Sequence, residues 1–271
     1  MSPTHSPPPT VALVHSSASS PAQWAALEHD LGADFAPLNA ALTGHGGQAP
    51  WAGHGPLSLA QEASALAAAI GPDQEVHLVG HSYGGAVALR FALERPGRVR
   101  SLTLFEPTLF TLLRFAPEEA DALQEILDLA QFVGARVLQG DHRGAMAAFV
   151  DYWNGDGAWA ATPERRRAAL AEKALLVANH FAGLEAQGPS PEAFAALQAP
   201  VLVMCGTRSP KPARAVSRVL VGAIPHARHR TIAGAGHMAP LTQPQRVNPL
   251  ILDALRSAED AAAAAPAARA G

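Results

Sequence analysis

Cysteine is almost absent from this 271-residue chain: Cys205 is its only one, so no disulfide can form within the chain. Cys205 follows the apolar run Val201 to Met204, a setting that favours a buried, unreactive thiol. No apolar run approaches the roughly 18 residues that a membrane span needs. Residues 1–10 also lack the charged segment and the apolar core of a signal peptide. We therefore expect a cytoplasmic protein without a membrane partner.

An excess of either charge is missing as well. The formal net charge is −3, which gives no reason to expect nucleic acid or an anionic membrane as a partner. Twelve histidines are present, but a high histidine count does not by itself make a metal site, and no metal or other cofactor is expected. Hydrophobic residues make up 48% of the chain, enough for a substantial core, and we expect a soluble globular protein.

Short apolar runs alternate with helical patterns along most of the chain. This alternation predicts an α/β fold, a mostly parallel sheet flanked by helices, with ligands bound at the carboxyl ends of the strands. The expected strands lie in residues 11–15, 35–38, 76–79, 99–105, 200–205 and 229–232.

The alternation stops in residues 108–199, where the patterns are helical only. We expect this segment to be a helical cap inserted at the carboxyl end of the sheet, between the core segments 11–107 and 200–257. Residues 1–10 and 258–271, rich in proline and serine or in alanine, are expected to be disordered tails. The aromatic residues of the cap are candidates for lining a pocket or for packing the cap itself: Phe110, Phe132, Phe149, Trp153 and Trp159.

The segment Gly80-His81-Ser82-Tyr83-Gly84 lies between an apolar run, Val76 to Val79, and a helical pattern, Gly85 to Glu94. This context is typical of a nucleophile elbow, a tight strand-to-helix turn that holds a serine in a strained conformation with its hydroxyl exposed. Glycines two residues before and two after the serine let the neighbouring backbone pass without a Cβ clash. The amides at the start of the following helix point toward the place where an oxyanion would form.

Three further segments accompany this elbow. Val14-His15-Ser16-Ser17 ends the first strand, Thr43-Gly-His-Gly-Gly47 follows the second, and Gly234-Ala-Gly-His237-Met-Ala-Pro240 follows the last. With them the chain resembles the α/β-hydrolase superfamily from Val11 to about Leu255. The three segments are similar to its oxyanion loop, with serine in place of a glycine, to its Gly-x-Gly loop and to the loop that carries its catalytic histidine.

The resemblance implies that Ser82 is the nucleophile and that His237 takes its proton during attack, since a serine alkoxide is too basic to form at neutral pH. It also implies an oxyanion hole made by the backbone amides of Tyr83 and Ser17, one such donor being worth about 3–4 kcal/mol of barrier. His15 is expected to brace the oxyanion loop by hydrogen bonds.

The acid that usually orients the histidine is missing from its common place. The family's commonest pattern has an aspartate after the penultimate strand, where this chain has Gly206-Thr-Arg-Ser209. From Ala193 to Leu252 there is no Asp or Glu at all. Glu106 ends the strand beyond that of the nucleophile, where some members, such as haloalkane dehalogenases, carry their acid, and it faces the same crevice. We therefore predict the triad Ser82, Glu106 and His237.

A serine nucleophile favours acyl transfer over the chemistry of haloalkane dehalogenases and epoxide hydrolases, which attack with a carboxylate. The predicted function is that of a serine carboxylic ester hydrolase, which acts on a small-molecule ester through an acyl-enzyme on Ser82 and needs no cofactor. The expected pocket residues are His81, Phe110, Trp153, Trp159 and Met238.

Other chemistries of the same fold remain open, because a fold does not set the reaction. They are a carbon–carbon bond hydrolase of ring-cleavage products, an aminopeptidase, a cofactor-free perhydrolase and a ligand-binding protein without turnover. A ring-cleavage hydrolase would need a basic residue for the substrate carboxylate, and Arg208 is the first candidate. An aminopeptidase would need cap carboxylates for the substrate ammonium, and those available are Glu118, Glu119, Asp121, Asp141, Asp151 and Asp156.

Overall fold

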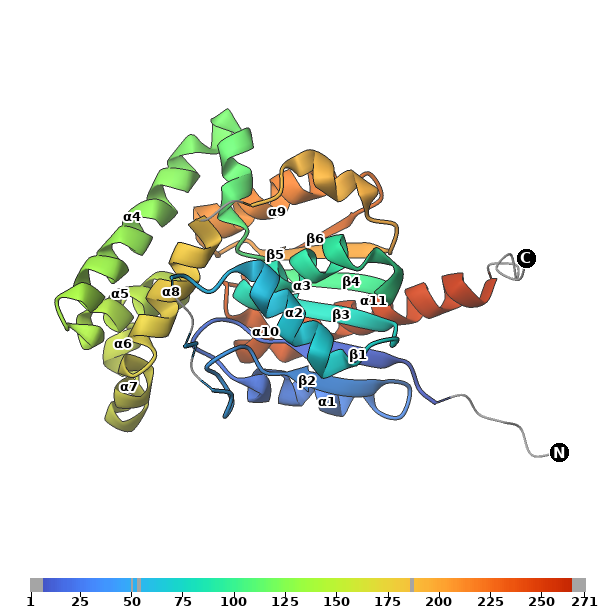
Figure 1. Cartoon of the computed structure of the whole chain (residues 1–271), viewed down its shortest axis with the longest axis horizontal. Helices are drawn as coiled ribbons and strands as arrows, with labels where there is room; N and C mark the ends of the chain where they lie inside the picture. The colour runs from blue at the N-terminus through green and yellow to red at the C-terminus, as the bar shows by residue number, and fades with distance from the viewer. Residues whose placement is uncertain (1–6, 50, 53–54, 186–187, 265–271) are drawn as a thin grey trace.

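The fold is built on one six-stranded sheet, seen in a computed structural model that describes residues 7–49, 51–52, 55–185 and 188–264 (Figure 1). The strand order is β2-β1-β3-β4-β5-β6, and every neighbouring pair runs parallel. The strands are β1 (Thr10–Val14), β2 (Ala36–Ala40), β3 (Val76–His81), β4 (Val99–Phe105), β5 (Val201–Gly206) and β6 (Arg228–Ile232).

Helices cover both faces of the sheet, which confirms the expected α/β fold (Figure 1). Helices α2 (Leu59–Ile70), α3 (Tyr83–Glu94) and α9 (Lys211–Ala223) lie on one face, and α1 (Ala25–Leu31) and α11 (Pro244–Ala264) on the other. Alternate residues of a strand join different cores: on β1, Ala12 and Val14 pack with the first group of helices, and Val11 and Leu13 with the second. Because both faces are buried, β1 and β5 contain continuous apolar runs, Val11 to Val14 and Val201 to Cys205, rather than alternating patterns.

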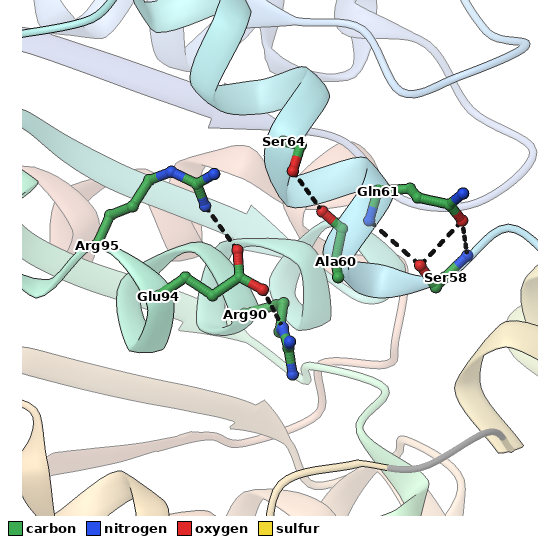
Figure 2. A network of polar contacts seen from close by, with 7 residues as sticks. All are labelled: Ser58, Ala60, Gln61, Ser64, Arg90, Glu94 and Arg95. Atoms are coloured by element: carbon green, nitrogen blue, oxygen red, sulfur yellow. Dashed lines mark hydrogen bonds and ion pairs between the residues drawn. The ribbon is translucent and has the colours of Figure 1, made fainter.

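Polar contacts at the start of α2 and at the end of α3 are shown in Figure 2. At the start of α2, the Ser58 hydroxyl accepts from the backbone amide of Gln61, whose side chain accepts from the Ser58 amide. At the end of α3, Glu94 pairs with Arg90 and Arg95. The pair Ser58 and Gln61 supplies hydrogen-bond partners for backbone amides that the start of a helix leaves without one. The partly exposed ion pairs of Glu94 each contribute less than about 1 kcal/mol to stability.

Residues 108–199, called here the inserted segment, lie between β4 and β5 and form helices but no strand in their described part. The helices between residues 120 and 185 stand beyond the carboxyl ends of the strands, and the 3-10 turn Pro191–Ala196 packs beside α9 and α3 on the way back to β5 (Figure 1). The helices are α4 (Ala120–Leu138), α5 (His142–Asn154), α6 (Ala158–Ala161), α7 (Glu164–Ala171) and α8 (Ala174–Glu185), with 3-10 turns at Phe110–Phe115, Pro117–Glu119 and Pro191–Ala196. Outside the segment are 3-10 turns at Pro21–Trp24 and Pro96–Arg98 and the short helix α10 (Ala239–Thr242).

The expected tails are shorter in the structure. Thr10 pairs with Ala36 as the first residue of β1, and α11 continues to Ala264, so residues 258–264 are helical rather than disordered. Alanine has the highest helix propensity and Ala258 is buried, and both favour continuation of the helix. The remainder of both predicted tails, residues 1–6 and 265–271, lies outside the described residues. Within the described ranges, no helix has both the length and the apolar character to cross a membrane.

The turn between β3 and α3 depends on contact between backbones. A Cβ placed on Gly84 would lie 2.3 Å from the carbonyl oxygen of His15 and 2.5 Å from that of Val14, so the end of β1 presses directly on the first turn of α3. A Cβ on Gly80 would lie 2.7 Å from the Cα of Gly85. Neither neighbour can give way cheaply because both are backbone atoms. The two glycines therefore set how closely the ends of β1 and β3 approach α3.

We expect Gly84→Ala to lower the free energy of unfolding by at least about 1–3 kcal/mol, the usual cost of overpacking. Thermal or urea unfolding would measure it. Gly222→Ala in α9 is the matched control, since no atom lies within 4 Å of its added Cβ and alanine favours a helix. A Gly84→Ala protein as stable as the wild type would show that the end of β1 can move away from α3.

Candidate active site

Ser82 occupies the strained turn that joins β3 to α3. Its backbone has φ 56° and ψ −123°, a region that a non-glycine residue adopts only under constraint. Its amide donates to the Phe105 carbonyl at 3.0 Å, which ties the turn to β4, and its carbonyl accepts from the amides of Gly85 and Ala86 in α3. The turn thus holds the serine hydroxyl at the carboxyl end of the sheet.

The three side chains predicted to act together form one chain of hydrogen bonds. His237 Nε2 lies 3.0 Å from Ser82 Oγ, and His237 Nδ1 lies 2.6 Å from Glu106 Oε2. Because a carboxylate only accepts hydrogen bonds, Nδ1 carries the proton and the Nε2 lone pair faces the serine hydroxyl. The imidazole therefore has the orientation of a base that can take the proton of Ser82.

Glu106 is fully buried, and both of its oxygens have partners. Oε1 accepts from the amide of Gly206 at 2.7 Å, while Oε2 accepts from His237. Gly206 ends β5, so the strand that carries an aspartate in the family's commonest pattern instead supplies an amide to the carboxylate of β4. Ser209, at the place of that aspartate, is buried, and its hydroxyl has no partner among the described residues.

Ser17 and Tyr83 lie on either side of the serine and line one cavity with it. The pressure of the β1 end on Gly84 brings the loop of Ser17 beside the first turn of α3, where the amide of Tyr83 begins the helix. His15 braces this loop as expected, because its Nδ1 donates to the Ser16 carbonyl at 2.8 Å and its Nε2 accepts from the Leu42 amide at 3.3 Å. The two residues that the resemblance implies for the oxyanion hole thus lie beside Ser82 at the same cavity.

Backbone strain gathers at this site. Among the described residues, the non-glycine residues with positive φ are Ala18, Ser82 and Glu106, at 56°, 56° and 46°. One follows Ser17 and the other two hold side chains of the hydrogen-bonded chain. Such conformations cost of order 1–3 kcal/mol each and persist only where the surroundings enforce them. Because all three lie at one site, this site lowers the free energy of unfolding in exchange for its geometry.

A narrow cavity with a volume of about 20 Å³, called here the inner cavity, lies beside Ser82. It carries no charged residue and draws mostly on apolar side chains of the inserted segment. Its lining residues are Ser17, Ser82, Tyr83, Thr108, Phe110, Phe149, Trp153, Val177, His180, Phe181 and Leu184.

Two wider spaces lie on the other side of Trp153. The outer cleft is lined by Ser82, His237 and Met238 together with residues 16–19 and helices α5 to α7, and its one charged lining residue is Arg166. The lateral cleft is lined by His237, Met238, Arg208 and Glu125 among others, without Ser82. Trp153 borders all three spaces, and its ring lies 4.1 Å from that of His237 between centroids. The indole is therefore a wall between separate approaches to the site.

The structure divides the expected pocket residues. Phe110, Trp153 and Met238 line the spaces just described. His81 does not line them: it is fully buried behind His237 and donates to its carbonyl at 2.9 Å, so it supports the histidine loop. Trp159 packs against the apolar core of the inserted segment, and its backbone amide donates to Asp151.

The aromatic residues considered alongside them also separate. Phe149 lines both the inner cavity and the outer cleft. Phe132 is 43% exposed and lies under the guanidinium of Arg136. The helical pattern shows which face of a helix is apolar, but it does not show whether that face meets a cavity, other helices or an arginine side chain.

Sequence reasoning missed His180, on α8. Its Nδ1 lies 2.8 Å from Ser17 Oγ, and its ring stacks on that of Tyr83 with 3.8 Å between centroids and 10° between planes. An isolated histidine inside an apolar helix carries no motif, so the sequence offered no signal for it. His15 and His45 lie close by, yet in the described part of the chain no three His, Cys, Asp or Glu side chains are placed to hold a metal ion.

Known proteins resemble this chain over most of its length. A family model described as the alpha/beta hydrolase fold matches residues 42–244, well over half of the chain. Among solved structures, a thermophilic esterase from Thermogutta terrifontis is similar with a TM-score of 0.69 and 22% identity, covering 92% of this chain and 90% of that one. The enol-lactonase from Burkholderia xenovorans LB400 has a TM-score of 0.72, 18% identity and 93% coverage of both chains.

Curated relatives match in shorter stretches. Lipase LipV of Mycobacterium tuberculosis is 42% identical over 87 residues, 31% of this chain and 31% of the lipase. Two further curated relatives also match this chain. For all three, the match covers less than two thirds of the relative's own length. At identities below 25%, the structural likenesses support the fold alone.

The buried histidines beside the site predict how stability depends on pH. Burial lowers the pKa of His15 to about 3 and that of His45 to about 4, and it holds the pKa of His180 well below its ordinary value. The unfolded chain protonates these groups near pH 6.5 but the folded chain does not, so stability falls as the pH drops from about 6.5 toward 4. Each such histidine contributes a slope of about 1.4 kcal/mol per pH unit.

We expect His45→Asn, which retains a donor for the Thr43 carbonyl, to lose less stability than the wild type between pH 7 and pH 5. Urea unfolding at both pH values would measure the difference, with His29→Asn at an exposed position as the control. Parallel losses in His45→Asn and the wild type would mean that His45 is protonated in the folded protein.

Proposed function

The chain belongs to the alpha/beta hydrolase fold family, and we propose that it is a carboxylic ester hydrolase that forms an acyl-enzyme on Ser82. One observation carries the proposal: the hydrogen-bonded chain from Glu106 through His237 to Ser82 ends at an uncharged, largely apolar cavity. A serine with a positioned base attacks acyl carbon, and an uncharged cavity suits the acyl part of an ester.

In the proposed reaction, Ser82 Oγ attacks the ester carbon as His237 Nε2 takes its proton. The amides of Ser17 and Tyr83 stabilise the negative charge that develops on the former carbonyl oxygen. Glu106 stabilises the imidazolium and keeps its Nδ1–H in place. His237 then returns the proton to the alcohol oxygen, the C–O bond breaks, and the acyl group remains on the serine.

Water completes the cycle by the same route. His237 removes a proton from a water molecule that attacks the acyl-enzyme, and the second tetrahedral intermediate collapses to release the acid and Ser82. Every proton passes through Nε2, so the reaction needs the one imidazole orientation that Glu106 imposes.

We assign the two parts of the ester to different spaces. The alcohol must lie within reach of His237, which lines the outer cleft with Ser82 but not the inner cavity. The acyl part then lies in the inner cavity, beside Ser17 and Tyr83. The inserted segment supplies Phe149 and Trp153 to both spaces, which supports its role as a cap over the site.

The residues that line these spaces also bear on the alternative functions, namely aminopeptidase, binding protein and carbon–carbon bond hydrolase. An aminopeptidase needs a carboxylate for the substrate ammonium, and the residues that line the inner cavity and outer cleft include no Asp or Glu. A binding protein without turnover has no use for a complete donor-acceptor chain with two strained backbone positions. Arg208 lines the lateral cleft beside His237, which keeps the carbon–carbon bond hydrolase as the second candidate.

We expect a fluorophosphonate to label the wild-type protein at Ser82, as located by peptide mass spectrometry, and Ser82→Ala to remain unlabelled. Glu106→Gln should stay folded but lower kcat on a p-nitrophenyl ester by about 10³–10⁴, because the amide no longer holds the required tautomer of His237.

Ser209→Ala is the matched control for the acid. It removes the hydroxyl at the place of the commoner aspartate, and nearly wild-type turnover is expected because this hydroxyl has no partner among the described residues. Near-normal turnover of Glu106→Gln would sink the assignment of the acid. A folded wild-type protein that neither labels nor cleaves esters would favour the binding protein instead.

The size of the inner cavity predicts acyl selectivity. The volume of this cavity is only about 20 Å³, on the order of the space that one water molecule needs, so a long acyl chain does not fit without rearrangement. We therefore expect kcat/KM for p-nitrophenyl butyrate to exceed that for the decanoate by at least about ten-fold. Val177→Ala should widen the cavity and narrow this ratio, whereas Leu175→Ala, at an exposed position of the same helix, should leave it unchanged. A preference for long acyl chains would place the acyl group in the outer cleft.

A further inference from the structure

His180 contacts both residues to which the proposed mechanism gives an oxyanion donor. It comes from α8 of the inserted segment, yet its Nδ1 is hydrogen-bonded to Ser17 Oγ at 2.8 Å. Its ring is stacked on Tyr83 at 3.8 Å, with 10° between the planes. One side chain therefore bridges the loop after β1 and the first residue of α3, the two elements from which the proposed mechanism draws its oxyanion donors.

We propose that His180 is a positioning residue that holds the amides of Ser17 and Tyr83 at the spacing an oxyanion requires. The proposal rests on the proposed ester hydrolysis and adds a residue from the inserted segment to it. His180 acts through its neighbours and touches no reacting atom in this role. Placement matters because hydrogen-bond donors stabilise the transition state only within a few tenths of an ångström of their ideal positions, and a 1 Å error can cost about 10²-fold in rate.

The loop that carries Ser17 needs such support. Ala18 has φ 56°, and a non-glycine residue keeps this conformation only where its neighbours enforce it. Lys173, just before α8, donates to the carbonyls of Ala18 and Ser19 at 3.2 and 3.0 Å. His180 holds the side chain of Ser17 from the same helix. These two ties come from the inserted segment and add to those that His15 and Gln23 make to Ser16 from the core, so the loop geometry depends in part on where α8 lies.

The surroundings of His180 keep its ring neutral and fixed. It is 2% exposed and lies near-parallel to the rings of both Tyr83 and His45. Burial lowers the pKa of His180 well below its ordinary value, with the nearby His45 and His15 acting in the same direction. A neutral imidazole can hold Ser17 through one nitrogen without placing a positive charge next to the acyl cavity.

Two substitutions separate the hydrogen bond from the stacking. His180→Phe keeps a flat ring on Tyr83 but removes the bond to Ser17. Ser17→Ala removes the same bond from the other side, retains the backbone amide, and does not disturb the core. The double variant completes a cycle, because residues that act through one shared bond show losses that do not add. His142→Phe, an exposed histidine of α5, is the control for the same substitution elsewhere in the inserted segment.

The measurements are kcat and KM on p-nitrophenyl butyrate and the inhibition constant of a trifluoromethyl ketone, which forms a tetrahedral adduct with the serine. We expect His180→Phe and Ser17→Ala each to lower kcat by about 10- to 100-fold with little change in KM. Affinity for the ketone should fall by the same factor, since it mimics the transition state. The double variant should lose no more than either single one.

Several results would overturn the proposal. The proposal fails if both single variants retain kcat within about two-fold of the wild type, or if their losses multiply in the double variant. A rise in KM without a fall in kcat would make His180 a substrate-binding residue instead. If the wild-type protein itself neither cleaves esters nor reacts with a fluorophosphonate at Ser82, the ester hydrolase proposal fails first. Active wild-type protein with unaffected variants removes the role of His180 alone.

Discussion

The buried carboxylate of Glu106 is the interaction to which the rest of the site is fitted. A charge without solvent is tolerated only where hydrogen bonds replace the lost water, and here the Gly206 amide and His237 Nδ1 supply them at 2.7 and 2.6 Å. The carboxylate in turn decides which nitrogen of His237 carries the proton. With the proton on Nδ1, Nε2 is left as the acceptor toward Ser82. The two buried oxygens of Glu106 therefore set the donor-to-acceptor direction of every hydrogen bond in the chain.

This arrangement requires backbones in close contact, and the strained positions follow from it. Gly84 touches the carbonyls at the end of β1, and a Cβ on Gly206 would lie 2.2 Å from the Ala235 carbonyl. Loops that press on one another in this way leave little freedom to Ser82 and Glu106, which take up positive φ angles. The apolar cores on both faces of the sheet offset the cost of this strain. The buried cores on the sheet thus stabilise the fold, and the strained backbone lies at the carboxyl edge of the sheet.

The sequence alone predicted the parallel sheet and the residues to seek at its edge, for definite physical reasons. Strand-turn-helix context and glycine spacing marked Ser82, and the absence of Asp and Glu from Ala193 to Leu252 left Glu106 as the acid that a neighbouring strand could deliver. The structure brings both to His237, while their catalytic roles stay predictions. Trp159 and His81 were expected to line the pocket, but they do not line the described spaces, and His180 was not predicted at all. Contacts within the inserted segment depend on how each helix is rotated and docked, and the periodicity of the sequence does not give this.

The core and the inserted segment each contribute to the stabilisation of both charges of the proposed transition state. As Ser82 attacks, negative charge grows on the acyl oxygen and positive charge on His237. The core places Glu106 and two amides near these charges. From the inserted segment, the Trp153 ring lies 4.1 Å from the imidazole, within the about 6 Å at which an aromatic face attracts a cation, and His180 holds both residues of the oxyanion site. A shift of α5 or α8 would therefore weaken the stabilisation of both charges, even though the hydrogen-bonded chain itself belongs to the core.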